Sequence, residues 1–187
     1  MIGLRRRFTP LQRLLHWLMA LCILAMLFIG VGMESTVTPK YLTLVSIHKP
    51  LGITILVLAL IRLVVRLRYG APPLPADLPG PIKLGAELSH YALYALMIGM
   101  PLIGWAMLSS ASYPIVLYGG IHLPAILPQS DRLHALLWDA HFYLAFAFFA
   151  LILAHIAAAL FHLLVRRDDV FQAMGPARAK SEVAPAE

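Results

Sequence analysis

Four long apolar stretches, separated by short connections, dominate the chain. They cover residues 14–33, 42–65, 84–108 and 133–165. Each reaches the roughly 20 apolar residues that a helix needs to cross a bilayer. The fourth is longer than about 30 Å of hydrocarbon requires. Its start, near His134, is therefore expected to protrude from the bilayer or to belong to a strongly tilted helix.

The connections complete a simple domain plan. Residues 71–81 are rich in proline and predict a non-helical loop. Residues 109–129 are apolar but broken by Pro and Gly, which indicates a segment at the membrane interface packed against protein. The sequence thus predicts an all-α integral membrane protein in which one domain, residues 1–170, forms a four-transmembrane-helix bundle. The predicted helices cover about 10–33, 42–66, 84–108 and 133–166, and residues 171–187 are predicted to form a disordered tail.

Composition supports a membrane protein and excludes several cofactor classes. Hydrophobic residues make up 60% of the 187 residues and charged residues only 13%, whereas soluble domains have about 45–50% and about 25%. The single cysteine, Cys22, excludes an internal disulfide. No Cys-x-x-Cys-His motif occurs, which excludes covalent haem attachment, and a thiolate-ligated iron–sulfur cluster is excluded as well.

The net charge of +6 is a topology signal rather than a nucleic-acid-binding signal. Lys and Arg concentrate in the N-terminal segment, the second connection and the C-terminal segment, which hold Arg5, Arg6, Arg7, Arg13, Arg62, Arg66, Arg68, Lys83, Arg166, Arg167, Arg178 and Lys180. The opposite side holds only Lys40, Lys49 and Arg132. The positive-inside rule therefore places both termini in the cytoplasm, where the basic residues also meet anionic lipids. The first apolar run is longer than a signal-peptide core and lacks an Ala-x-Ala site, so we interpret it as a retained helix.

The histidines are the candidate cofactor-binding residues. His141 and His155 lie fourteen residues apart on the fourth predicted helix, which places them roughly 21 Å apart on one stripe. Polar groups in lipid are costly and usually functional. With the predicted orientation, His48 lies at the periplasmic level of His141, and His16 lies at the cytoplasmic level of His155. Two imidazoles on facing helices suit a six-coordinate haem iron.

The pair predicted at the cytoplasmic level, which we call the inner pair, has an alternative. Distances from Arg13 and Arg166 pair His16 with His162, whereas a helix that begins at Thr9–Pro10 pairs His16 with His155. Any single membrane histidine can also simply bond to a backbone carbonyl. Contacts to a haem propionate or to quinone are a further use for nearby polar residues. The candidates for them are Arg13, Lys49, His90 and His162. His134 is interpreted as an interfacial residue or a propionate partner, and His122 as an ordinary loop residue.

Five motifs together resemble the bacterial cytochrome b561 family. They are RLLHW (13–17), HKPLG (48–52) with LALIRLVVR (58–66), PLIGW (101–105) with Tyr113-Pro114, and HFYLA (141–145) with His155. The resemblance covers about residues 8–170 and implies a multi-pass cytochrome of the bacterial inner membrane with two non-covalent b haems. It implies His16 and His155 as axial ligands of the cytoplasmic-side haem, and thus favours His155 over His162. It implies His48 and His141 as ligands of the periplasmic-side haem, with no catalytic side chain beyond the haems.

The resemblance further implies a superoxide oxidase, which passes electrons from periplasmic superoxide to ubiquinone in the respiratory chain. Three cations on the periplasmic side, Lys40, Lys49 and Arg132, face three acids, Glu34, Asp131 and Asp139, so the formal charge is 3 − 3 = 0. Global attraction of an anion is therefore weak, and a local attraction near Lys49 remains. That attraction serves either superoxide or a haem propionate.

Two other functions are compatible with the histidines. An electron-transfer cytochrome b subunit would carry quinol electrons to a redox partner protein, but the short connections offer it little docking surface beyond residues 109–132. The expected partners are therefore lipids, quinone, and superoxide or another periplasmic one-electron donor or acceptor, and not nucleic acid. A transporter would use the histidines as zinc or proton sites and would be colourless.

Overall fold

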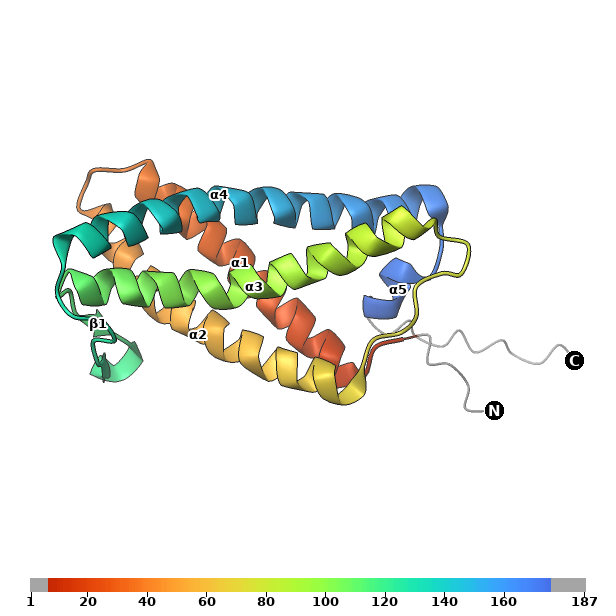
Figure 1. The fold of residues 1–187 in the computed structure, drawn as a ribbon, viewed down its shortest axis with the longest axis horizontal. Helices are drawn as coiled ribbons and strands as arrows, with labels where there is room; N and C mark the ends of the chain where they lie inside the picture. The colour runs from red at the N-terminus through yellow and green to blue at the C-terminus, as the bar shows by residue number, and fades with distance from the viewer. Residues whose placement is uncertain (1–6, 176–187) are drawn as a thin grey trace, which may run out of the picture.

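The computed structural model describes residues 7–175, which form four long helices arranged side by side in alternating directions (Figure 1). The long helices are α1 (Pro10–Glu34), α2 (Lys40–Tyr69), α3 (Gly80–Ser110) and α4 (Asp131–Phe161), and a π-helical turn, η2 (His162–Arg166), continues α4. The described remainder contains strand β1 (Ile115–Val116), the 3₁₀ turn η1 (Tyr118–Gly120), strand β2 (His122–Leu123) and the short helix α5 (Val170–Met174). When η2 is counted with α4, the four helices begin and end within four residues of the predicted ranges.

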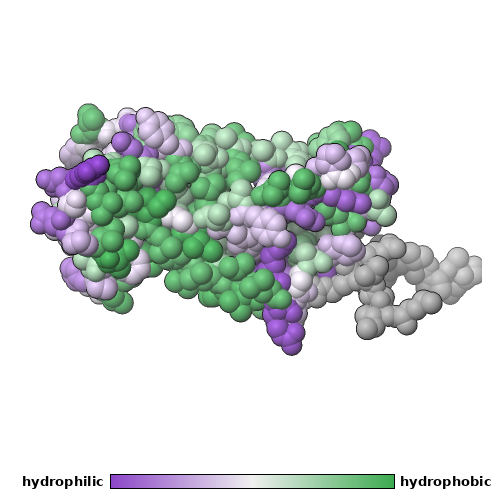
Figure 2. Space-filling model, in the orientation of Figure 1, coloured by the Kyte–Doolittle hydropathy of each residue, from purple (hydrophilic) through white to green (hydrophobic). Residues whose placement is uncertain are grey.

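All four long helices are long and apolar enough to span a membrane. Large hydrophobic side chains remain exposed along them, for example Phe28 at 79% and Leu67 at 77%. Figure 2 shows that apolar surface covers much of the middle of the bundle, with polar surface concentrated towards its ends. Such a surface needs lipid around it. The predicted fold class, a four-helix membrane bundle, is confirmed.

The two ends of the bundle differ. At one end, which we call the terminal end, lie the start of α1, the α2–α3 connection and α5 (Figure 1). At the opposite end, the hairpin end, lie the α1–α2 connection and the segment between α3 and α4. Local sequence explains the terminal start of α1, because Thr9 and Gln12 form a reciprocal capping box and Pro10 occupies the first turn.

The segment between α3 and α4, predicted as a broken stretch at the membrane interface, contains a short β-hairpin. β1 and β2 pair antiparallel, with Ile115 opposite Leu123. The turn needs Gly119 and Gly120, whose φ angles of 73° and 79° are unfavourable for other residues. The hairpin is tied to the bundle by the Trp105 indole, which donates a 2.9 Å hydrogen bond to the Pro124 carbonyl.

The predicted disordered tail also begins too early. Residues 170–174 form α5, which lies against the start of α1. Three groups on that segment donate to α5 or the residue after it: Phe8 N to Ala173 O at 3.1 Å, Trp17 Nε1 to Met174 O at 3.0 Å and Arg13 Nη1 to Gly175 O at 3.1 Å. These tertiary bonds stabilise a helix too short to form alone. The predicted tail beyond residue 175 lies outside the described residues.

Candidate functional site

Two histidine pairs lie at different levels of the bundle. Towards the hairpin end, the rings of His48 on α2 and His141 on α4 are 6.2 Å apart between centroids, with an angle of 69° between their planes. Towards the terminal end, the rings of His16 on α1 and His155 on α4 are 6.3 Å apart, with an angle of 65°. The structure thus brings together the two predicted pairs, and α4 contributes one histidine to each.

An apolar layer separates the pairs. Six side chains form the most buried cluster of the described bundle: Met19, Ala59, Met97, Met100, Phe148 and Ile152. Phe148 is seven residues from His141 and seven from His155, so it lies about 10 Å along α4 from each. The layer therefore places buried apolar side chains between the two levels.

The imidazoles have unmet bonding capacity. The Nδ1 atoms of His16 and His48 are buried and have no hydrogen-bond partner within residues 7–175. The buried Nδ1 of His141 also lacks a hydrogen bond of standard geometry, although its ring interacts with the Met100 backbone. A buried polar atom without a partner costs about 1–3 kcal/mol. Paired imidazoles with unbonded nitrogens fit a site that holds a metal-centred group.

The spacing of each pair agrees with a bis-imidazole iron. Two metal–nitrogen bonds of about 2 Å each, plus roughly 1 Å from nitrogen to ring centre on both sides, add to about 6 Å. The two pairs measure 6.2 and 6.3 Å. Within the described residues, no three His, Cys, Asp or Glu side chains form a group able to hold a metal ion by themselves. The arrangement therefore suits haem, which needs two axial ligands, better than zinc, which takes about four.

Gly104 on α3 makes room for the pair of His48 and His141, which we call the outer pair. A Cβ atom at this position would lie 3.3 Å from Cε1 and 3.6 Å from Nδ1 of His141. The absence of a side chain thus allows α3 to approach the imidazole closely. Sequence reasoning had noted Gly104 only as part of the PLIGW motif, because its role depends on which face of α3 meets α4.

A third histidine lies at the level of His16 and His155, the inner pair. The ring of His90 on α3 lies 5.7 Å from that of His155, and its Nδ1 donates a 2.6 Å hydrogen bond to the Ala86 carbonyl. This bond leaves Nε2 as the acceptor nitrogen. His90 was predicted as a propionate or quinone contact without a matched partner. The structure places it beside His155, at the edge of the inner pair, and its contact with a propionate or quinone stays a prediction.

Other predicted contacts lie farther from the pairs. His162 donates from Nδ1 to Asp168 at 2.7 Å rather than joining His16. Burial alone would raise the pKa of Asp168, but hydrogen bonds from His162 and Arg166 lower this pKa below its usual value. Arg13 bonds to the Gly175 carbonyl, while its Nε is buried without a partner in the described chain. Among the remaining histidines, His134 donates to the Met107 carbonyl at 2.9 Å.

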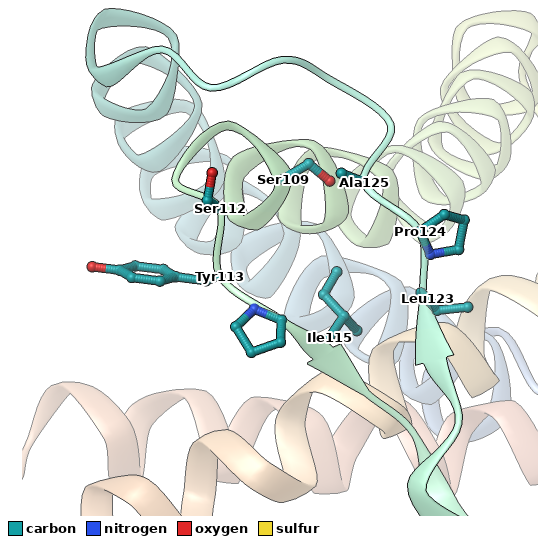
Figure 3. Close-up of a pocket in the computed structure, with 8 residues that line it drawn as sticks. Ser109, Ser112, Tyr113, Ile115, Leu123, Pro124 and Ala125 are labelled. Atoms are coloured by element: carbon teal, nitrogen blue, oxygen red, sulfur yellow. The ribbon is translucent and has the colours of Figure 1, made fainter.

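A cavity of about 270 Å³ opens at the hairpin end, between the end of α3 and the two strands (Figure 3). Ser109 and Ser112 are among its lining residues, and the Tyr113 ring points away from the strands. Pro114 on its rim accepts a 3.2 Å hydrogen bond from Lys49 Nζ. Since Lys49 follows His48 on α2, this bond connects the cavity rim to the helix that carries His48 and holds a positive charge at the hairpin.

Comparison with known proteins finds a matching family and several relatives. Residues 7–177 match the family described as prokaryotic cytochrome b561. The chain is 31% identical over 176 residues to cytochrome b561 homolog 1 of Escherichia coli K12, covering 92% of this chain and 98% of that protein. It is 29% identical over 179 residues to the probable superoxide oxidase CybB of Yersinia pestis, again covering 92% and 98%. Cytochrome b561 homolog 2 of Escherichia coli is 28% identical over 171 residues, with 90% of both chains covered.

Proposed function

We propose, since the chain belongs to the prokaryotic cytochrome b561 family of membrane b-type cytochromes, that it transfers electrons from superoxide to ubiquinone through two non-covalent b haems. The observation that carries the proposal is the presence of two histidine pairs on opposite sides of an apolar layer, with buried ring nitrogens left unbonded. The probable superoxide oxidase CybB of Yersinia pestis supports the choice of substrate.

His48 and His141 would hold one haem, and His16 and His155 the other. Bound haem b supplies reversible one-electron redox chemistry. The chain orients the ligands on rigid helices, and Gly104 leaves space for His141. The layer around Phe148 places buried apolar side chains between the levels. No side chain is required as nucleophile, acid or base for the electron step.

The proposed reaction balances with two superoxide anions for each quinone. Each superoxide gives up one electron and leaves as dioxygen, and ubiquinone takes up two electrons and two protons to become ubiquinol. Lys49 lies beside His48 and holds its ammonium group at the hairpin. It therefore offers a local positive charge to an anionic donor. This role requires the hairpin end to face the periplasm and both termini to lie in the cytoplasm, as the distribution of Lys and Arg predicts.

Stopped-flow mixing of the oxidised, detergent-solubilised protein with superoxide tests the proposal. We expect the absorption bands of reduced b haem to appear after mixing. Superoxide dismutase, added beforehand, should prevent their appearance. Added ubiquinone should then reoxidise the protein and be recovered as ubiquinol. Oxidised bands that remain unchanged by superoxide, in a protein that dithionite still reduces, would exclude superoxide as the donor.

An electron-transfer subunit is the second candidate. Tyr118 and Ile121 at the hairpin are 62% and 61% exposed, and they offer an apolar contact to a partner at the membrane surface. Co-purification of a redox protein in fixed stoichiometry, with no reaction towards superoxide, would favour this function.

A further inference from the structure

Two arginines at the terminal end share one aromatic ring. The guanidinium groups of Arg62 and Arg66, one turn apart on α2, lie 5.8 and 5.9 Å from the centre of the Tyr94 ring on α3. With Tyr94 they line a small space that Gln12 and Met174 also border. Both arginines are partly buried, so each guanidinium group has lost part of its contact with solvent or lipid headgroups.

The charge of this cluster is not balanced by the protein. Among the described residues, the ion pairs are those of Asp168 with His162 and Arg166 and of Asp77 with Arg166. Neither Arg62 nor Arg66 takes part in them. A cation held within a membrane bundle is costly unless an anion accompanies it. The ring of Tyr94 offsets part of this cost, but a neutral ring does not replace a counter-ion.

The cluster borders the inner histidine level. Gln12, which borders the same space, lies one turn before His16 on α1, and Tyr94 lies one turn after His90 on α3. An anion bound between the arginines would therefore lie about one helical turn from the inner histidine level.

We propose that Arg62 and Arg66 bind the propionate carboxylates of the haem held by His16 and His155. The inference rests on the proposed function, because it requires haem at the inner pair. A b haem carries two carboxylates at one edge, and arginine binds carboxylates through two parallel N–H donors. The positive charge also stabilises the electron-rich reduced state, so the two arginines raise the reduction potential of this haem relative to a site without them.

Redox titration of the purified holoprotein tests this assignment. Arg62→Gln and Arg66→Gln are expected to lower one of the two haem midpoint potentials and leave the other unchanged. The lowered potential should also become pH-dependent, because an unpaired propionate takes up a proton more readily. Arg68→Gln, which alters an exposed residue of the same helix, should leave both potentials as in the wild type.

The same substitution made in a His155→Ala variant tests whether the shift in potential belongs to the inner haem. In His155→Ala, which is expected to lose that haem, Arg66→Gln should not change the remaining potential. Arg62→Lys retains the charge without the two-pronged donor, and it should shift the potential less than Arg62→Gln. If Arg62→Gln fails to fold, the comparison of Arg62→Lys and Arg66→Gln with Arg68→Gln still decides the question.

Three results would overturn the inference. They are potentials equal to those of the wild type in both glutamine variants, equal shifts of both haems, and a shift that appears only in nanodiscs containing anionic lipid. The last would mean that a lipid phosphate is the anion. Failure of the proposed function would look different, because the wild-type protein itself would lack b-type spectra or would not react with superoxide.

Discussion

Gly104 of α3 lies directly against the imidazole of His141 on α4, and a Cβ atom there would come within 3.3 Å of Cε1. This is shorter than an ordinary van der Waals contact. The ring would have to shift by a few tenths of an ångström to accept it. The position of His141, and hence its alignment with His48, therefore depends on a missing side chain one helix away.

Gly104→Ala should weaken the outer site. Overpacking of this kind costs about 1–3 kcal/mol, and we expect the variant to lose much of one haem while keeping the other. Gly99→Ala is the matched control on the same helix, because a Cβ atom at Gly99 meets nothing within 4 Å. Haem quantitation per protein and thermal melting of both variants provide the measurement. A Gly104→Ala protein with two haems and the melting temperature of Gly99→Ala would contradict the close contact.

His141→Ala and His155→Ala should each remove one haem of two. Each residue is the α4 member of a different pair, and a single remaining imidazole holds b haem weakly. His122→Ala, on the exposed strand β2, serves as the control and should retain both. The pyridine haemochrome assay gives the stoichiometry, and reduced-minus-oxidised spectra show which bands disappear. A variant that keeps both haems would refute the ligand assignment for the substituted residue.

The bundle and its paired histidines were predictable from sequence for a physical reason. Lipid demands long apolar helices, so helix number follows from hydropathy. Depth then follows from the position of a residue along its helix, which restricts the predicted partners of His16 to His155 and His162; the rings of His16 and His155 lie 6.3 Å apart. Depth alone did not decide between His155 and His162. The structure adds that His162 is held by Asp168.

Features that depend on helix rotation or on tertiary contacts were not predictable. His90 lies at the depth of His155, but only the packing of α3 against α4 reveals that their rings are 5.7 Å apart. The hairpin strands are two residues long, too short for an alternating pattern. Helix α5 depends on hydrogen bonds from residues more than 150 positions earlier, including Trp17. The sequence of residues 170–174 contains no local pattern that predicts these hydrogen bonds.

Lys49→Gln should slow the reaction with superoxide about two- to tenfold at low salt. The expected effect is modest because the formal charge of this face is balanced and only the ammonium group beside His48 attracts the anion locally. The rate constant of the wild type should fall as salt increases, and that of the variant should fall less. Stopped-flow traces at several ionic strengths measure both.

Two further variants separate charge from position in this experiment. Lys49→Arg retains the charge and should keep most of the rate, while Lys40→Gln removes an exposed charge at the start of the same helix and should have little effect. Equal slowing by Lys40→Gln and Lys49→Gln would show that the face acts through its total charge, against a local role for Lys49.

Asp168→Asn should destabilise the terminal end in a pH-dependent way. The carboxylate accepts hydrogen bonds from His162 at 2.7 Å and Arg166 at 3.0 Å, and losing it should cost about 1 kcal/mol at neutral pH. The pKa of Asp168 is lowered in the folded protein. Its contribution is therefore present above the ordinary carboxyl value of about 4 and is lost as the pH falls below it.

Thermal melting of wild type and Asp168→Asn between pH 7 and pH 3 measures this difference. The gap between the two melting temperatures should be constant near neutrality and should close in the acid range. Asp169→Asn is the matched control, because the neighbouring Asp169 is exposed and its side chain makes no capping bond to α5. A gap that persists unchanged at pH 3 would mean that the carboxylate charge is not what stabilises this turn, because the neutral acid and the amide would then differ for another reason.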